Sequence, residues 1–125
     1  MNALMYASMP DVKANDMESV VKELFTPDRL DYFRSIDRLS ERLQRTWENE
    51  SLIVILICSR EDLVEFVSMR ERLHQFRLVL VLPDAEETTI SLAHRLRPNY
   101  LAYIYSHPGE LKAVLRKMIE KGDVH

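Results

Sequence analysis

The segment Leu52-Ile53-Val54-Ile55-Leu56-Ile57-Cys58 decides the fold that this chain can adopt. Every position in it is apolar and β-branched residues dominate it, which is typical of a strand buried on both faces of a sheet. The segment is too short to cross a bilayer. It therefore predicts the central strand of a parallel sheet, ending abruptly at Ser59-Arg60-Glu61-Asp62.

The composition is that of one compact domain over residues 1–125. The chain is 46% hydrophobic and 30% charged, which is enough apolar material for a proper core. Its formal net charge of −3 weighs against nucleic acid or an anionic membrane as the main partner. We therefore expect neither nucleic acid nor membrane to be a partner.

The residue types that the chain lacks exclude several classes of site. A single cysteine, Cys58, rules out an internal disulfide and a cysteine-rich zinc site. The only glycines are Gly109 and Gly122, so neither a dinucleotide fingerprint nor a phosphate-binding P-loop can be written in this chain. The start of the sequence lacks the basic segment and long apolar run of a signal peptide. We expect a soluble, cytoplasmic protein without a cofactor.

Four further segments have the composition of strands, and five segments have helical periodicity. The predicted strands besides the central one are Ala3–Ala7, Leu30–Ser35, Leu78–Leu82 and Tyr100–Tyr105. The first predicted helix begins at Asn15, which forms a capping box with Glu18, and the second begins at Ile36 after Ser35. The third begins at Ser59 and continues through Phe76, and the fourth begins at Asp84 as the cap, with Glu87 as the acid of the first turn. The fifth begins at Pro108 and ends near Gly122. The connections between all these segments are short.

The alternation of five strands with five helices predicts a three-layer α/β fold. Right-handed crossovers give one parallel sheet with helices on both faces. The two fully apolar strands, Leu52–Cys58 and Leu78–Leu82, belong inside the sheet, and the mixed strands belong at its edges. This arrangement predicts a flavodoxin-like sheet of order 2-1-3-4-5.

Three segments carry a resemblance to a known family: Leu30 to Ser35, Leu78 to Pro83, and Tyr103 to Leu111. They are similar to the second strand, the fourth strand, and the fifth strand with the entry to the last helix, of the receiver domain of two-component response regulators. The chain resembles this domain over essentially its whole length. The resemblance implies a bacterial signal-transduction module. It also implies that function depends on the residues at the strand ends.

The residues at those strand ends differ from those of a working receiver. A receiver binds a divalent metal through acidic residues after its first strand, where this chain has Ala7-Ser8-Met9. The phospho-accepting aspartate corresponds to Ile57, Cys58 or Ser59, and none of these is a carboxylate. Pro83 stands at or beside the hydroxyl position after strand four, and Ser106 or His107 replaces the lysine after strand five. We therefore expect a pseudo-receiver that has no metal site and no aspartyl phosphate.

Two other groups of residues could carry a function. Ser8, Ser59, Arg60, Ser106 and His107 could converge on an anion above the sheet, because parallel strand ends meet at one edge. Cys58 could be a thiol activated by Arg60 or His107, although a buried cysteine that acts as a small hydrophobic residue is the favoured interpretation. The histidines show no metal-ligand spacing.

The strand Tyr100–Tyr105 could instead contact a partner. Tyr100, Tyr103 and Tyr105 lie near Arg95 and Arg97, a combination that is common at interface hot spots. The alternative is that the tyrosines pack beneath neighbouring helices. An edge strand without charges favours self-association, so a homodimer through this strand and its flanking helices is one expectation.

Two hypotheses therefore follow from the sequence. The first is a phosphorylation-independent, receiver-like protein-interaction module that is not an enzyme and recognises a protein partner or a second copy of itself. The second is a small ligand-sensing, redox or enzymatic domain that uses the edge around Cys58, Arg60 and His107. The absence of a coherent catalytic set favours the first hypothesis.

Overall fold

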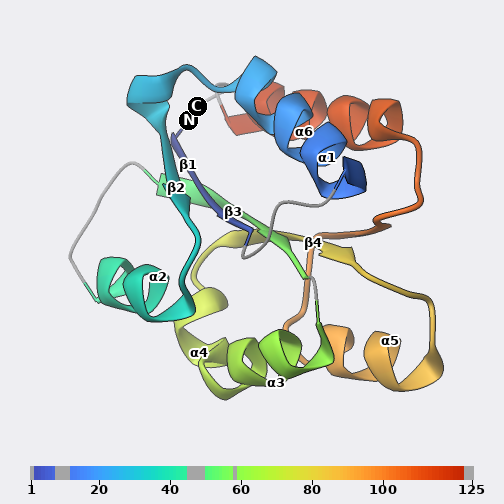
Figure 1. Cartoon of the computed structure of the whole chain (residues 1–125). Coiled ribbons are helices and arrows are strands. Elements are labelled where there is room, and N and C mark those ends of the chain that lie inside the picture. The colour runs from blue at the N-terminus through green and yellow to red at the C-terminus, as the bar shows by residue number, and fades with distance from the viewer. Residues whose placement is uncertain (1, 8–11, 45–49, 58, 123–125) are drawn as a thin grey trace.

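The fold is a five-stranded parallel sheet between two layers of helices, seen in a computed structural model that describes residues 2–7, 12–44, 50–57 and 59–122 (Figure 1). The strands are β1 (Asn2–Ala7), β2 (Leu30–Phe33), β3 (Glu50–Leu56), β4 (Arg77–Leu82) and β5 (Tyr100–Tyr103). Their order is β2-β1-β3-β4-β5, and all four pairs are parallel. The predicted flavodoxin-like α/β fold is confirmed.

The helices divide between the two faces of the sheet. They are α1 (Val12–Leu24), α2 (Ile36–Leu43), α3 (Arg60–Ser68), α4 (Arg70–Leu73), α5 (Glu87–His94) and α6 (Pro108–Gly122), with a short 3₁₀ helix η1 (Pro27–Arg29) before β2. In Figure 1, α1 and α6 cover one face, and α2 to α5 cover the other. None of the helices in the described ranges is both long enough and apolar enough to span a bilayer.

Strand β3 is the centre of the core, as its sequence predicts. Ile53 and Ile55 pack with the helices of the α3 side, while Leu52, Val54 and Leu56 pack with α1 and α6. All five side chains are buried because neighbours cover both faces of the strand. Burial on both faces explains why the segment is apolar at every position.

Three strands end earlier than predicted, while β1, β3 and β4 begin one or two residues before the predicted starts. Strand β3 ends at Leu56, two residues before Cys58, which lies outside the described residues. Strand β2 ends at Phe33, since Ser35 precedes α2. Strand β5 ends at Tyr103 and not at Tyr105, because the chain turns back there through a contact with Ser106.

The helices also correct the prediction. The expected single helix from Ser59 to Phe76 breaks at Met69, whose φ of −112° and ψ of 23° are not helical, and this break separates α3 from α4. There are thus six α-helices in the described part of the chain, where the sequence predicted five. Asn15 lies inside α1, so the predicted capping box with Glu18 is wrong.

The start of α5 differs for a local reason. Asp84 accepts a hydrogen bond from the Glu86 backbone N–H (3.0 Å), a turn that comes before the helix. Glu86 therefore takes the position before the first helical residue, which is Glu87, and Asp84 is not the cap. In contrast, α6 begins at Pro108 as predicted, since proline suits the first position of a helix.

Candidate functional site

The carboxyl edge of the sheet is where the sequence predicted a functional site, and Ser59 lies at the start of α3 there. Its Oγ accepts a hydrogen bond from the Asp62 backbone N–H (3.2 Å), so it caps the helix as predicted. The Asp62 carboxylate in turn accepts a hydrogen bond from the hydroxyl of Tyr6, at the end of β1 (3.2 Å). The Tyr6 ring is buried edge-on against Phe66, with 5.0 Å between ring centroids. Ser59 thus caps α3, and the Tyr6–Asp62 hydrogen bond ties this helix to β1.

Two hollows accompany α3, one at each end. The first, of about 260 Å³, is open and polar and lies beside the Tyr6–Asp62 contact. It is lined by Tyr6, Ser35, Ile36, Asp37, Asp62 and Glu65. The second, of about 440 Å³, is lined by Ser68 to Arg72 at the opposite end of the helix, away from the strand ends. Both are surface depressions.

Arg60, a residue of the possible anion site, is paired with an acid. Its guanidinium forms an ion pair with the carboxylate of Glu86, the residue before α5. Both side chains are largely exposed, so this pair links the starts of α3 and α5 at the surface. Surface pairs of this kind contribute little to stability.

Ser106 lies just after the end of β5, and His107 lies directly before the start of α6. The Tyr103 N–H donates to Ser106 Oγ (3.1 Å), and the Ser106 N–H donates to the Tyr103 carbonyl (2.8 Å), which ends β5. His107 Nδ1 then accepts the N–H of Gly109 (3.0 Å), so its imidazole caps α6. The sequence indicated both residues only as possible members of an anion site and did not predict these backbone contacts.

Two predicted residues of this edge cannot be placed. Ser8 and Cys58 lie outside the described residues, together with the connection from β1 to α1. Ile57, the residue before Cys58, is buried and pairs through its backbone N–H with the Val81 carbonyl (2.8 Å). Within the described ranges, no three His, Cys, Asp or Glu side chains are grouped so that they could bind a metal ion.

The tyrosines of β5 separate onto the two faces of the sheet. Tyr100 packs against the core beneath α1 and α6, whereas Tyr103 packs against the core on the α5 side, and both are half-buried. Tyr105, beyond the strand, is 69% exposed. Packing under helices therefore accounts for two of the three tyrosines.

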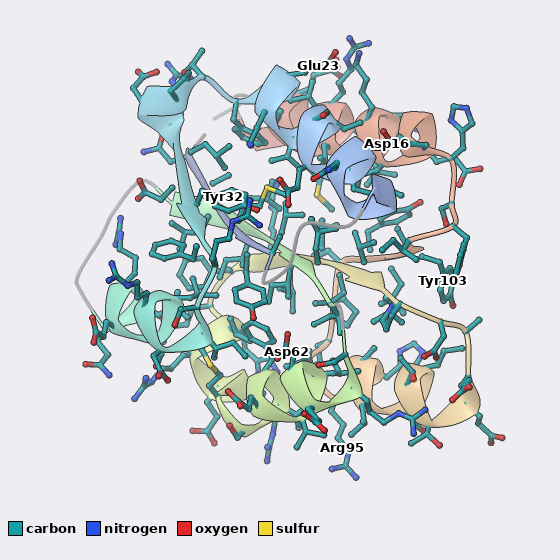
Figure 2. The ribbon with its side chains drawn as sticks, viewed as in Figure 1. Asp16, Glu23, Tyr32, Asp62, Arg95 and Tyr103 are labelled. Carbon is teal, nitrogen blue, oxygen red and sulfur yellow. The ribbon has the colours of Figure 1, made fainter. Side chains whose placement is uncertain are left out.

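Arg95, one of the two arginines of the predicted interface, lies apart from Tyr103. Figure 2 shows Arg95 directed away from the sheet below the helices, at a distance from Tyr103 at the β5 edge. Arg97 is exposed and follows α5 in the left-handed region, with φ of 50°. Arg95 therefore does not stack on Tyr103 in this structure.

A second polar cluster, which the sequence analysis missed, lies between α1 and the edge strand β2. Glu18, on α1, is only 4% exposed and accepts a hydrogen bond from the Tyr32 hydroxyl (2.7 Å). Lys22 and Arg34 each place a nitrogen 3.8 Å from a Glu18 oxygen and lie over the Tyr32 ring, at 5.2 and 4.8 Å from its centroid. We call Glu18, Lys22, Tyr32 and Arg34 the β2-edge cluster.

The sequence contains one signal for this cluster. Glu18 is adjacent to the buried Met17 and lies three residues before the buried Val21, so it shares the apolar face of α1. A carboxylate on such a face needs a partner. Arg34 adds a contact of its own, since its Nη1 donates to the carbonyl of Ala7 at the end of β1 (3.3 Å).

Comparison with known proteins supports the fold but does not assign the chain to a protein family. No protein-family model matches the chain, and no curated protein matches it. One solved structure is similar, that of a protein from Burkholderia pseudomallei K96243 provisionally described as pilus assembly-related. The two chains share 16% identity with a TM-score of 0.64 over 94% of this chain and 87% of the other. This likeness shows a shared fold.

Proposed function

We propose that this chain is a phosphorylation-independent, receiver-like module that acts by binding a protein partner or a second copy of itself. The observation that carries the proposal is the use of the polar residues at the carboxyl edge of the sheet. Ser59 and His107 cap helices and Ser106 closes a strand. Residues engaged with the backbone in this way stabilise the scaffold and are poorly suited to chemistry.

The geometry of this edge also supports a fixed scaffold rather than a phosphorylation switch. A receiver needs a carboxylate at the end of its third strand, whereas Ile57 is buried there with an apolar side chain. Of the two acids in the first turn of α3, Glu61 and Asp62, the second is engaged by the Tyr6 hydroxyl. The edge is therefore suited to one stable state.

The similar solved structure supports the class of function. It is provisionally described as pilus assembly-related, and assembly systems are built from protein–protein contacts. A compact α/β scaffold that recognises another protein fits such a role. The proposal extends to binding a protein and not to a particular pathway.

The proposal predicts that phosphoryl analogues leave the protein unchanged. Beryllofluoride with magnesium should cause no shift in the amide NMR resonances of Ser59, Asp62 and Ser106, because none of Ile57, Cys58 and Ser59 at the phosphoacceptor position is a carboxylate. A receiver with an intact aspartate, measured under the same conditions, is the positive control. Saturable shifts at Ser59 and Ser106 would show that the edge binds a phosphoryl group and would overturn the proposal.

A further inference from the structure

The β2-edge cluster has two cations for one carboxylate. The side chains of Lys22 and Arg34 are 56% and 49% exposed, whereas the Glu18 side chain is 5% exposed. The negative charge thus lies beneath the surface and both positive charges lie at it. The cluster therefore presents a net charge of +1 to solvent.

Glu18 attracts Lys22 and Arg34 but forms a hydrogen bond with neither of them. Both nitrogens lie 3.8 Å from its oxygens, a separation that gives Coulombic attraction without a hydrogen bond. Glu18 instead accepts its close hydrogen bond from Tyr32, at 2.7 Å. Arg34 Nη1 donates to the Ala7 carbonyl. The Lys22 ammonium and the other guanidinium nitrogens of Arg34 remain able to bind an anion that approaches from solvent.

The Tyr32 ring holds the two cations together. Lys22 comes from α1 and Arg34 follows β2, yet both lie over this ring at distances typical of cation–π contacts. Figure 2 shows Tyr32 between the β2 ribbon and α1, at the outer side of the sheet. Since β2 is the terminal strand of the sheet, a partner can reach the cluster from that side.

From this arrangement we infer that the β2-edge cluster is a binding site for a carboxylate side chain of an acidic protein segment. The inference rests on the proposed function and names the chemistry of one partner. A net charge of +1 matches a single carboxylate. The overall charge of −3 disfavours a nucleic acid or an anionic membrane at this site.

A short capped peptide of alternating glutamate and alanine tests the inference, with NMR as the readout. Shifts should concentrate at Lys22, Tyr32 and Arg34 and should saturate, whereas the same peptide with glutamine in place of glutamate should cause none. The double variant Lys22→Gln, Arg34→Gln should bind about tenfold more weakly, as expected when two exposed charge contacts are lost. Raising the salt concentration should weaken binding by the native chain.

Three variants separate binding from folding. Lys22→Gln alone leaves the Arg34–Glu18 pair in place and should still reduce affinity. Arg34→Lys keeps the charge and should retain most of the binding. Lys117→Gln, which removes an exposed cation from α6, should have no effect.

The possible results distinguish this inference from the proposed function. If shifts concentrate elsewhere, for example at Arg95 and Arg97, or if no shift occurs, the site is wrong while a protein-interaction module stands. Inorganic phosphate that produces the same shifts with equal or higher affinity would overturn the acidic protein partner. Beryllofluoride shifts at Ser59 and Ser106 would overturn the proposed function without affecting the β2-edge cluster.

Discussion

Single polar side chains define where elements begin and end at the carboxyl edge of the sheet. Ser106 is the best example, because its hydroxyl accepts the Tyr103 N–H and its own N–H donates to the Tyr103 carbonyl. The two bonds satisfy both backbone groups of the last strand residue. His107 follows directly and satisfies the N–H of Gly109 at the start of α6. Strand and helix can thus be joined by a very short connection.

Replacing Ser106 with alanine should therefore lower the free energy of unfolding by about 1 kcal/mol, since it leaves the Tyr103 N–H without its acceptor. Urea denaturation followed by circular dichroism measures the change. Ser91→Ala, an exposed serine on α5, is the matched control and should change stability by less than about 0.5 kcal/mol. Equal stability of Ser106→Ala and the native chain would contradict the role of this hydroxyl in closing β5.

At the scale of elements, α1 and α6 pack side by side over one face of the sheet. Val21 from α1 and Phe25, which directly follows α1, join Leu111 and Leu115 from α6 in the same buried cluster. A surface ion pair adds to this contact, with Lys112 Nζ 2.9 Å from a Glu23 oxygen. The hydrogen bond and the positive charge of Lys112 lower the pKa of the Glu23 carboxyl, with a smaller contribution from Arg116.

This lowered pKa predicts how the ion pair depends on pH. Because the pKa of Glu23 is lower in the folded state than in the unfolded state, the pair stabilises the fold at pH values above the ordinary glutamate pKa of about 4.3. The contribution disappears as the pH falls through the pKa of the folded state. Glu23→Gln should therefore be less stable than the native chain at pH 7 and equally stable once Glu23 is protonated in both states.

Thermal unfolding of four chains tests this prediction: the native chain, Glu23→Gln, Lys112→Gln and the double variant. The two single variants should lose the same pH-dependent stability, and the double variant should lose little more than either. A difference between native and Glu23→Gln that persists unchanged at low pH would indicate a packing effect and contradict the ion pair as its cause.

At the scale of the whole molecule, the sheet has two edges of different chemistry. Strand β2 carries the exposed Asp31, which pairs with Arg42 at 3.5 Å, and the β2-edge cluster lies on its other face. Strand β5 has no charged residue from Tyr100 to Tyr103, and Tyr105 follows it with 69% exposure. An uncharged edge strand is prone to pair with another chain. Self-association is therefore expected at β5.

Analytical ultracentrifugation at micromolar concentration should find a dimer of the native chain. The variant Tyr103→Glu, Arg97→Glu should be a monomer, because a charge on the edge strand opposes pairing. Tyr103 packs against the core and its replacement can lower stability, so Tyr105→Glu provides a second test at an exposed position. Arg29→Glu, near β2, is the matched charge reversal and should remain dimeric. A monomeric native chain would contradict self-association through β5.

Much of the architecture was determined by the sequence alone, because the signals for it are local. The run from Leu52 to Cys58 predicts a strand that is buried on both faces, and the structure buries the side chains from Leu52 to Ile57. Ser59 before α3 and Pro108 at the start of α6 mark helix starts correctly. With the right-handedness of parallel crossovers, these segments permit few arrangements, and strand order 2-1-3-4-5 is the one observed.

The polar contacts were decided only by the tertiary structure, since their partners are distant in the chain. Glu18 meets Tyr32 across 14 residues, and Tyr6 meets Asp62 across 56. The register of β1 with β2, which pairs Met5 with Tyr32, brings that tyrosine alongside α1. Likewise, the sequence around Met69 contains no glycine or proline that would predict the helix break there. The local pattern places Glu18 on the apolar face of α1. It cannot name Tyr32 as the partner, because that depends on which elements come to cover the helix.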